Sequence, residues 1–497
     1  MHIHMVAIGS TGDVRPYVLL GKELRRRGHE VTIVAFANFA AMAEEAGLGF
    51  YPLAGDVMDF MERIMKPGVV GAKFLRQVEQ SLRDVAPVLL HDLMEAFRGA
   101  DAMICTFFGS TYYSVAEKYG IPVVQTQYFP MDPNRQMPIS SAPAWKLGPA
   151  WNLATYRLGY LLIHLLEHRY LTAWREENHV TVPRIHGGPD YALGGHTIPV
   201  IYAISPLVVP RPAQWGRNIH MSGFWVDEES KPFVPPRELA DFLAAGEKPV
   251  YIGFGSMVSG NMRKTFDVVM KAVRAAGLRV ILDNGWSGAG LAGASNVFTL
   301  SSFVPHDWLF PQMRAVVHHG GAGTTAAGLR AGCPTLVIPF GGDQPFWGSR
   351  VWALGCGPKP IRRENLTVSR LTRALVDLTH HEAYARAAQA LGAGLRQEHG
   401  IITAADLVEQ EVRRWLAGPA QTEARTAAIH IERGKEGALC SSGLRKYCTG
   451  YRDRWGAIST TRPRGNASPI RRTCPWWRPA SSSCPSWWRP SASGRRG

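Results

Sequence analysis

Short apolar runs alternate with amphipathic stretches along most of this chain. An apolar run at His2–Gly9 is followed by helical spacing of apolar residues at Tyr17–Arg27 and by a second apolar run at Val31–Phe36. Three more runs of strand length follow in the first half, at 102–105, 122–125 and 200–203. Because this alternation is typical of β-α-β units, it predicts a doubly wound parallel sheet.

The same alternation restarts in the second half. A run YIGFGS from Tyr251 precedes a helical stretch, Lys264–Ala276, and the runs RVILDNG and TLVIP follow. The intervening segment 206–236 contains six prolines and is predicted to be a linker. The expected organisation is therefore α/β, with Rossmann-like domains at 1–205 and 237–417. Two such domains facing each other place a cleft between the carboxyl ends of their strands.

Residues 418–497 differ from the rest in composition. Residues 421–497 hold 15 of the 55 Lys and Arg but 4 of the 40 Asp and Glu, so most of the net charge of +15 belongs to this tail. CPWWRP recurs as CPSWWRP, and no helical or strand period is present, which predicts disorder. The tail is either a basic arm for an anionic membrane or nucleic acid, or the out-of-frame translation of GC-rich DNA.

The body of the chain has the features of a cytoplasmic protein. Cys105, Cys333 and Cys356 lie in apolar or Gly-rich surroundings without metal-ligand spacing, and are expected to be buried thiols. The four tail cysteines are too far apart for a CxxC zinc site. No signal peptide precedes the first strand, and Leu158–Leu166 is too short to span a bilayer.

A glycine-rich segment after the apolar run Ala315–Val317 has the composition of an anion site. His318-His319 are followed by GGAGTT and by a helix-compatible stretch. Glycines let backbone N–H groups approach an anion, and a helix N-terminus adds partial positive charge. Thr324 or Thr325 is expected to cap that helix. The spacing matches neither GxxxxGK[ST] nor GxGxxG, and two histidines stand in place of the lysine. A diphosphate recognised without lysine or a dedicated metal cage suggests a nucleotide-sugar whose diphosphate leaves with its negative charge stabilised.

The order of these motifs resembles that of family 1 nucleotide-sugar glycosyltransferases of the GT-B fold. FVPHDWLFPQ, HHGGAGTT and GDQ in the second half, and GSTGDVRP after the first strand, are similar to the sterol 3-beta-glucosyltransferases and to the bacterial antibiotic glycosyltransferases. The resemblance covers about residues 1–417. It implies an acceptor-binding first domain, a donor-binding second domain, and inverting transfer of a hexose.

Asp13 is the candidate general base by this resemblance, since related enzymes place a catalytic histidine there. A carboxylate at a strand-to-helix turn can accept the proton of an attacking hydroxyl. The alternative is that Asp13 caps a helix beginning near Val14-Arg15-Pro16. Ser10, Thr11 and Gly12 form the loop beside donor and acceptor.

The donor site is also implied by position. Phe303 occupies the place of a base-stacking tryptophan, with ordinary core packing as the alternative, and Val304 offers backbone atoms to the base. His319 is expected to contact the diphosphate and to stabilise its departure, with His318 as support. Ala327 replaces the glutamate that binds the ribose in plant-type members. The remaining diphosphate and sugar contacts are expected from Ser256, Gly321, Gly323, Thr324, Asp343 and Gln344.

The acceptor side is the least specified. Residues 151–174 are predicted to form a long amphipathic helix that either packs on the core or lines an apolar acceptor pocket or membrane contact. Trp145, Trp151 and Tyr156 are the candidate lining residues.

The expected activity is UDP-sugar-dependent transfer, of glucose above all, to a sterol or sterol-like lipid, without metal or cofactor because no DxD motif occurs. The alternatives are a TDP- or UDP-sugar transferase acting on a macrolide, glycopeptide, polyketide or phenolic, and a non-catalytic nucleotide-sugar-binding protein. No specific nucleic-acid partner is expected.

Overall fold

The computed structural model describes residues 1–55, 80, 86–106, 110–139, 142, 147–180, 192–193, 195–228, 233–255, 262–283 and 295–418. They fall within one unit, Met1–Thr426. The predicted tail lies outside the described residues except for Gly418. Two parallel sheets of seven and five strands, both flanked by helices, confirm the predicted α/β class.

The first sheet has the strand order β3-β2-β1-β4-β5-β8-β9, and all neighbouring strands are parallel. Met5 pairs with Ile33 on one side and Ile104 on the other, and all three side chains are fully buried. Such continuous burial is expected of a parallel sheet covered on both faces. The strands are β1 (His2–Val6), β2 (Glu30–Phe36), β3 (Gly49–Leu53), β4 (Ala102–Thr106), β5 (Val123–Gln127), β8 (Val200–Tyr202) and β9 (Ile219–Met221).

Five labelled helices and a further helical stretch, residues 86–96, accompany this sheet, together with a short antiparallel pair, β6 (Ala192–Leu193) and β7 (His196–Thr197). The long helix predicted for residues 151–174 is present and extends a few residues further at each end. Among the described residues, no helix combines the length and apolar character needed to cross a bilayer. The helices are α1 (Thr11–Arg26), α2 (Ala40–Glu45), α5 (Thr111–Tyr119), α6 (Pro149–Asn178) and α14 (Gly400–Leu416).

The second sheet has the order β12-β11-β10-β13-β14 and is also parallel throughout. Its strands are β10 (Val250–Gly253), β11 (Val280–Leu282), β12 (Val297–Thr299), β13 (Ala315–His318) and β14 (Thr335–Val337). Its helices are α7 (Arg237–Ala244), α8 (Met262–Ala276), α9 (His306–Leu309), α10 (Ala322–Arg330), α11 (Gln344–Ala353), α12 (Val368–His380) and α13 (Glu382–Leu395). The helix α8 contacts α12, and α10 contacts α13.

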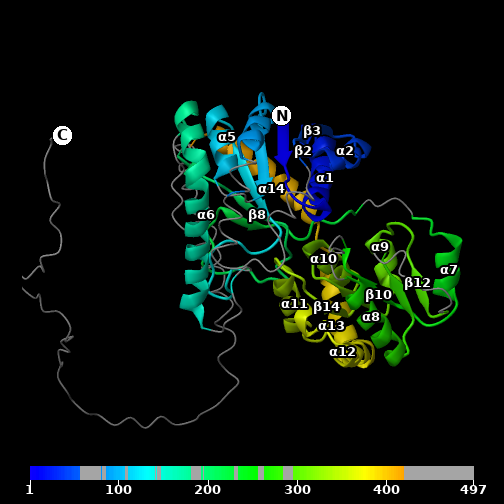
Figure 1. Cartoon of the computed structure of the whole chain (residues 1–497). Helices are drawn as coiled ribbons and strands as arrows, with labels where there is room; N and C mark the ends of the chain where they lie inside the picture. Colours follow the sequence, from blue (N-terminus) through cyan, green and yellow to red (C-terminus); the bar gives the residue numbers. More distant parts are fainter. Residues whose placement is uncertain are drawn as a thin grey trace, which may run out of the picture. The chain divides into compact units, whose positions relative to one another are not determined.

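Two elements join the first sheet from segments that were expected elsewhere. The strand β9 lies within the Pro-rich segment predicted to be a linker. The helix α14 follows the second sheet in sequence, yet Figure 1 shows it beside α1, and Ala404 and Val408 are buried in the core of the first sheet. Arg27 Nη1 donates to Asp406 at 2.6 Å across this contact. The first domain is therefore completed by residues that come after the second.

Candidate functional site

The turn between β1 and α1 holds the Asp13 carboxylate by a reciprocal cap. Ser10 is the N-cap residue, and its hydroxyl accepts a hydrogen bond from the Gly12 N–H at 3.3 Å. Asp13 Oδ2 in turn accepts from the Ser10 N–H at 2.7 Å and from its hydroxyl at 3.0 Å. A side chain on Gly9, whose φ is +156°, would lie 2.3 Å from Asp13 Oδ2, so glycine is needed there.

This geometry revises the capping alternative for Asp13. The helix begins at Thr11, so Asp13 is its third residue and completes a capping box from within the helix. Both bonds engage Oδ2, which leaves Oδ1 for another partner. Burial raises the pKa of the Asp13 carboxyl, although the hydrogen bonds from Ser10 oppose the rise. A carboxylate with a raised pKa is a better proton acceptor than a free aspartate.

His318 and His319 follow β13 and play different structural parts. The His318 side chain is fully buried, and its Nδ1 accepts a hydrogen bond from the Gly320 N–H at 2.9 Å. His319 is half-buried, and burial lowers its pKa to about 4, so the ring is neutral at pH 7. Within the described part of the chain its Nδ1 has no hydrogen-bond partner. A neutral imidazole carries one N–H, so His319 can donate a hydrogen bond to an anion but brings no positive charge.

Two glycines flank the His319 ring. A Cβ on Gly321 would lie 2.6 Å from His319 Nε2, and a Cβ on Gly255 would lie 3.3 Å from His319 Cε1. The backbone of Gly255 is itself held by Asp283 Oδ2, which accepts from its N–H at 3.1 Å. The His319 ring therefore lies between the backbones of Gly255 and Gly321, and a side chain at either glycine would press against the ring.

The helix α10 begins directly after this ring. Gly321 is its N-cap and makes no side-chain capping bond. The prediction that Thr324 or Thr325 caps the helix is wrong, because the helix starts earlier, at Ala322, and the Thr325 hydroxyl donates instead to the Gly321 carbonyl at 2.9 Å. The first N–H groups of a helix lack intrahelical partners, so those of Ala322, Gly323 and Thr324 are available to an anion.

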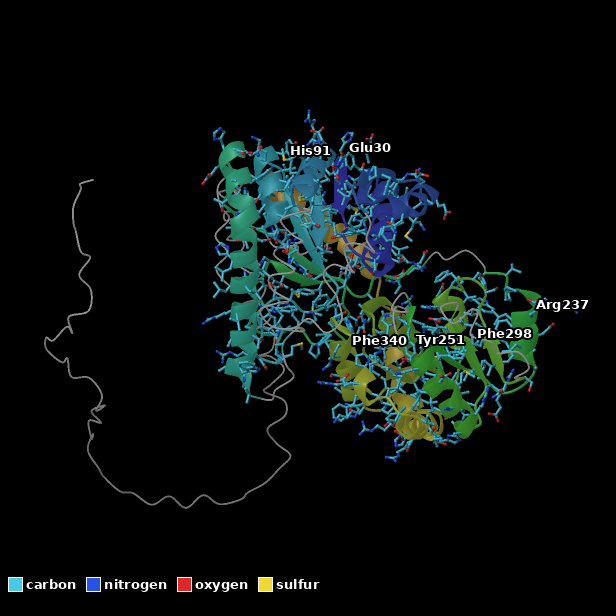
Figure 2. All side chains as sticks on the ribbon, viewed as in Figure 1. Glu30, His91, Arg237, Tyr251, Phe298 and Phe340 are labelled. Carbon is cyan, nitrogen blue, oxygen red and sulfur yellow. The ribbon has the colours of Figure 1, made fainter. Side chains whose placement is uncertain are left out.

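Asp343 and Gln344 open α11 at the end of the loop after β14. Asp343 Oδ2 accepts from the indole N–H of the buried Trp347 at 2.8 Å. Burial, with a smaller contribution from the negative charge of Asp13, raises the Asp343 pKa to about 6. Gln344 Oε1 accepts from the N–H of Phe340, which is labelled in Figure 2, at 2.7 Å and from that of Gly341 at 3.1 Å. The Gln344 amide nitrogen is thus the end left for a ligand.

Phe303 presents an aromatic ring at the same edge of the second sheet. Its side chain is 56% exposed, which excludes the ordinary core packing considered as an alternative, whereas Val304 is buried. The guanidinium of Arg15, the fifth residue of α1, lies 5.3 Å from the centre of the Phe303 ring. Arg15 also contributes, after burial, to lowering the pKa of His306 to about 4.

The structure therefore brings α1 to the candidate donor residues that follow the strands of the second sheet. The Arg15 guanidinium faces the Phe303 ring, and the negative charge of Asp13 is a minor cause of the raised Asp343 pKa. Arg15 and Trp347 were missed by sequence reasoning. Arg15 belongs to the GSTGDVRP motif, so its place two residues after Asp13 was the available signal; nothing in the sequence marked Trp347 as the partner of Asp343.

The remaining candidates are Ser256 and the acceptor residues Trp145, Trp151 and Tyr156. Ser256 and Trp145 lie outside the described residues. Trp151 is half-buried on α6, and Tyr156 is completely buried, with its hydroxyl accepting from Asn134 Nδ2 at 2.8 Å. Tyr156 therefore packs in the core of the first domain.

Comparison with known proteins agrees with this arrangement. Residues 3–138 match the family described as Glycosyltransferase family 28 N-terminal domain, and residues 269–398 match Erythromycin biosynthesis protein CIII-like, C-terminal domain. Over 419 residues, 81% of this chain, the sequence is 36% identical to the sterol 3-beta-glucosyltransferase UGT80A2 of Arabidopsis thaliana. The chain belongs to the GT-B glycosyltransferases.

A solved structure supports the fold of this GT-B glycosyltransferase. The glycotransferase of kitacinnamycin matches 83% of this chain and 99% of its own, with a TM-score of 0.59 and 23% identity. A sterol 3-beta-glucosyltransferase of Candida albicans is 34% identical over 83% of this chain. The chain spans 64% of the length of the Arabidopsis protein and 28% of that of the Candida protein. It is thus homologous to sterol 3-beta-glucosyltransferases without covering their full length.

Proposed function

We propose that this protein transfers glucose from UDP-glucose to the hydroxyl of a sterol or sterol-like lipid with inversion at the anomeric carbon. The observation that carries the proposal is the approach of α1 to the candidate donor residues: the Arg15 guanidinium lies 5.3 Å from the centre of the Phe303 ring, and Asp13 precedes Arg15 by two residues on the same helix. A base beside a donor site is what direct displacement by an alcohol requires. The printed names of the Arabidopsis and Candida relatives support the acceptor class.

In the proposed reaction Asp13 accepts the proton of the acceptor hydroxyl while its oxygen forms a bond to the anomeric carbon. The bond between that carbon and the diphosphate oxygen breaks, and its electron pair leaves with UDP. The His319 N–H and the first N–H groups of α10 donate hydrogen bonds to the departing diphosphate. His319 is neutral at pH 7 and brings no positive charge to the diphosphate. The positive charge near the Phe303 ring comes from Arg15 of α1.

On the donor side, Phe303 offers an exposed face for the base, as any π face permits stacking. The Asp343 carboxylate and the Gln344 amide nitrogen face the sugar hydroxyls. The proposed assignment uses Asp343 Oδ1, since Oδ2 is engaged by Trp347. The protein needs no metal in this scheme, because the helix terminus, His319 and Arg15 act on the diphosphate.

A second candidate function is the transfer of a deoxysugar from a TDP-sugar to an antibiotic aglycone. The match of residues 269–398 to the erythromycin CIII-like domain favours it. UDP and TDP differ in the base and in the 2′-hydroxyl, and both place a diphosphate at His319 and α10. The two functions are therefore separated by substrate, not by the diphosphate contacts.

The test is acceptor-dependent release of UDP from UDP-glucose, or of TDP from a TDP-sugar, with a panel of sterols, macrolides and phenolics. Asp13→Asn is the decisive variant, because an amide oxygen still accepts from Ser10 but is not a base. We expect at least about a thousandfold loss of kcat with nucleotide affinity retained. Tight UDP binding without transfer to any acceptor would instead favour a nucleotide-sugar-binding protein.

A further inference from the structure

The helix α6 carries an exposed apolar stripe on one of its faces. Leu158, Leu161, Leu162 and Leu165, hereafter the α6 leucine face, are 36% to 65% exposed. They stand at positions i, i+3, i+4 and i+7, which place them on one side of a helix. On the other side, Tyr156, Tyr160 and Leu171 are buried in the core of the first sheet.

The surroundings of this face are consistent with a free surface. Figure 1 shows α6 along the outside of the elements of the first sheet, and α5 is among the helices that contact it. Tyr160 anchors the inner side, with its hydroxyl donating to the Met131 carbonyl at 3.0 Å. The core thus fixes the orientation of α6, and the leucines point away from it. Contiguous exposed apolar side chains of this kind mark interaction surfaces more often than isolated ones do.

Charge indicates what covers the α6 leucine face. Arg157 is exposed beside it. In the sequence, the stretch 133–166 contains Arg135, Lys146 and Arg157 but no Asp or Glu. If two copies of the chain docked through this face, neither stripe would offer a carboxylate to Arg157. The phosphates of an anionic bilayer would do so, while the leucines enter its interface.

We propose that the α6 leucine face is a docking surface for anionic phospholipid bilayers. The leucines insert at the boundary between headgroups and acyl chains, with the helix lying along the membrane, and Arg157 contacts lipid phosphates. Docking of this kind needs neither donor nor acceptor, so the proposal goes beyond the proposed function. If the acceptor is a membrane lipid, the same surface brings the protein to it.

Vesicle co-sedimentation of the full chain without nucleotide sugar or acceptor tests the proposal. One set of vesicles is pure phosphatidylcholine, and the other contains about 30 mol% phosphatidylserine. The triple variant Leu158→Gln, Leu161→Gln, Leu165→Gln should bind the anionic vesicles at least about tenfold more weakly than wild type. Leu416→Gln is the matched control, because Leu416 of α14 is also 65% exposed, and it should bind as wild type does.

Arg157→Gln separates charge from apolar contact. We expect about fivefold weaker binding to the anionic vesicles and no change on phosphatidylcholine. Equal binding of wild type and the triple variant would overturn the proposal. The proposal would also fail if a chain ending at Gly418 lost binding while the leucine variants kept it, since that result would assign binding to the tail. A wild-type dimer that the triple variant abolishes would assign the face to a second copy.

Folding of each variant is checked by circular dichroism and Tm. Transfer to an acceptor dispersed in detergent should be unchanged in the triple variant, since none of its residues lies among the donor or base residues. Loss of vesicle binding with detergent activity retained supports docking. Absence of activity in wild type would contradict the proposed function and leave the vesicle result interpretable by itself.

Discussion

Replacing Gly321 with alanine tests whether the position of the His319 ring controls diphosphate binding. The new Cβ would lie 2.6 Å from Nε2, 3.4 Å from Cε1 and 3.5 Å from Cδ2. Carbon and nitrogen atoms settle at about 3.5 Å or more, so the ring must retreat by about 1 Å. The imidazole N–H would then move away from the N-terminus of α10.

The expected loss of UDP affinity follows from the hydrogen bond between the His319 N–H and the diphosphate, which this movement breaks. A hydrogen bond to a charged group contributes about 1.5–3 kcal/mol, so the affinity for UDP should fall roughly 10- to 100-fold. Gly321 has an extended backbone with φ −60° and ψ 145°, which alanine adopts without strain. The loss is therefore expected in binding and not in folding, and Tm should change little.

Gly323→Ala is the matched control, two residues further along the same helix terminus. Its Cβ would meet nothing within 4 Å, and the backbone N–H is retained. Alanine within α10 should raise stability by about 0.5–1 kcal/mol. Isothermal titration with UDP compares the two variants, and the NMR resonances of the His319 ring report its displacement. Wild-type affinity in Gly321→Ala, or equal weakening in Gly323→Ala, would refute the reasoning.

Three further predictions concern the residues around this ring. Burial places the Asp13 pKa above the ordinary 3.8, so kcat/KM should fall as the pH drops through that pKa. Ser10→Ala removes a hydrogen bond to the carboxylate, so the acid limb of the pH-rate profile should move to higher pH. Loss of the same cap should lower the free energy of unfolding by about 1 kcal/mol. Asp343→Ala leaves the buried Trp347 N–H unpaired and should cost about 1–3 kcal/mol of stability in urea unfolding, whereas Asp343→Asn should keep that bond and lose only donor binding. Arg15→Gln should weaken UDP binding about fivefold or more and reduce its salt dependence, and Arg15→Lys should restore part of both; an unchanged salt dependence would contradict this role.

The sequence predicted the elements that local patterns encode. Apolar runs located β1, β2, β4, β5 and β8, and the glycine-rich motif located the start of α10 to within a few residues. These features are local, because strand burial and helix initiation depend on neighbouring residues. The N-cap of α10 was misassigned, since a threonine after glycine fits a cap or a first turn equally well. The choice between them depends on where β13 ends.

Contacts between distant segments were not predictable in the same way. The apolar face of α14 has the same period whether it covers the first or the second sheet, and its pairing with Arg27 through Asp406 depends on the return of the chain. Likewise, the stacking role proposed for Phe303 came from a motif resemblance, whereas the position of Arg15 over its ring depends on the placement of α1. Amphipathic spacing located α6 but did not indicate which of its leucines would stay exposed.

The electrostatics of the candidate site follow from three neutral histidines. Burial is the main cause of the lowered pKa of His306, His318 and His319, so none carries a positive charge at pH 7. Among the described groups next to His319, the N-terminus of α10, equivalent to about half a positive charge, would act on a diphosphate bound there. The full charge of Arg15 comes from the first domain. Binding of the diphosphate should therefore favour the arrangement in which α1 approaches Phe303, and the same approach brings Asp13 to the donor. Donor affinity, through Arg15, and the placement of the proposed base, Asp13, are thus coupled, because both residues belong to one turn of α1.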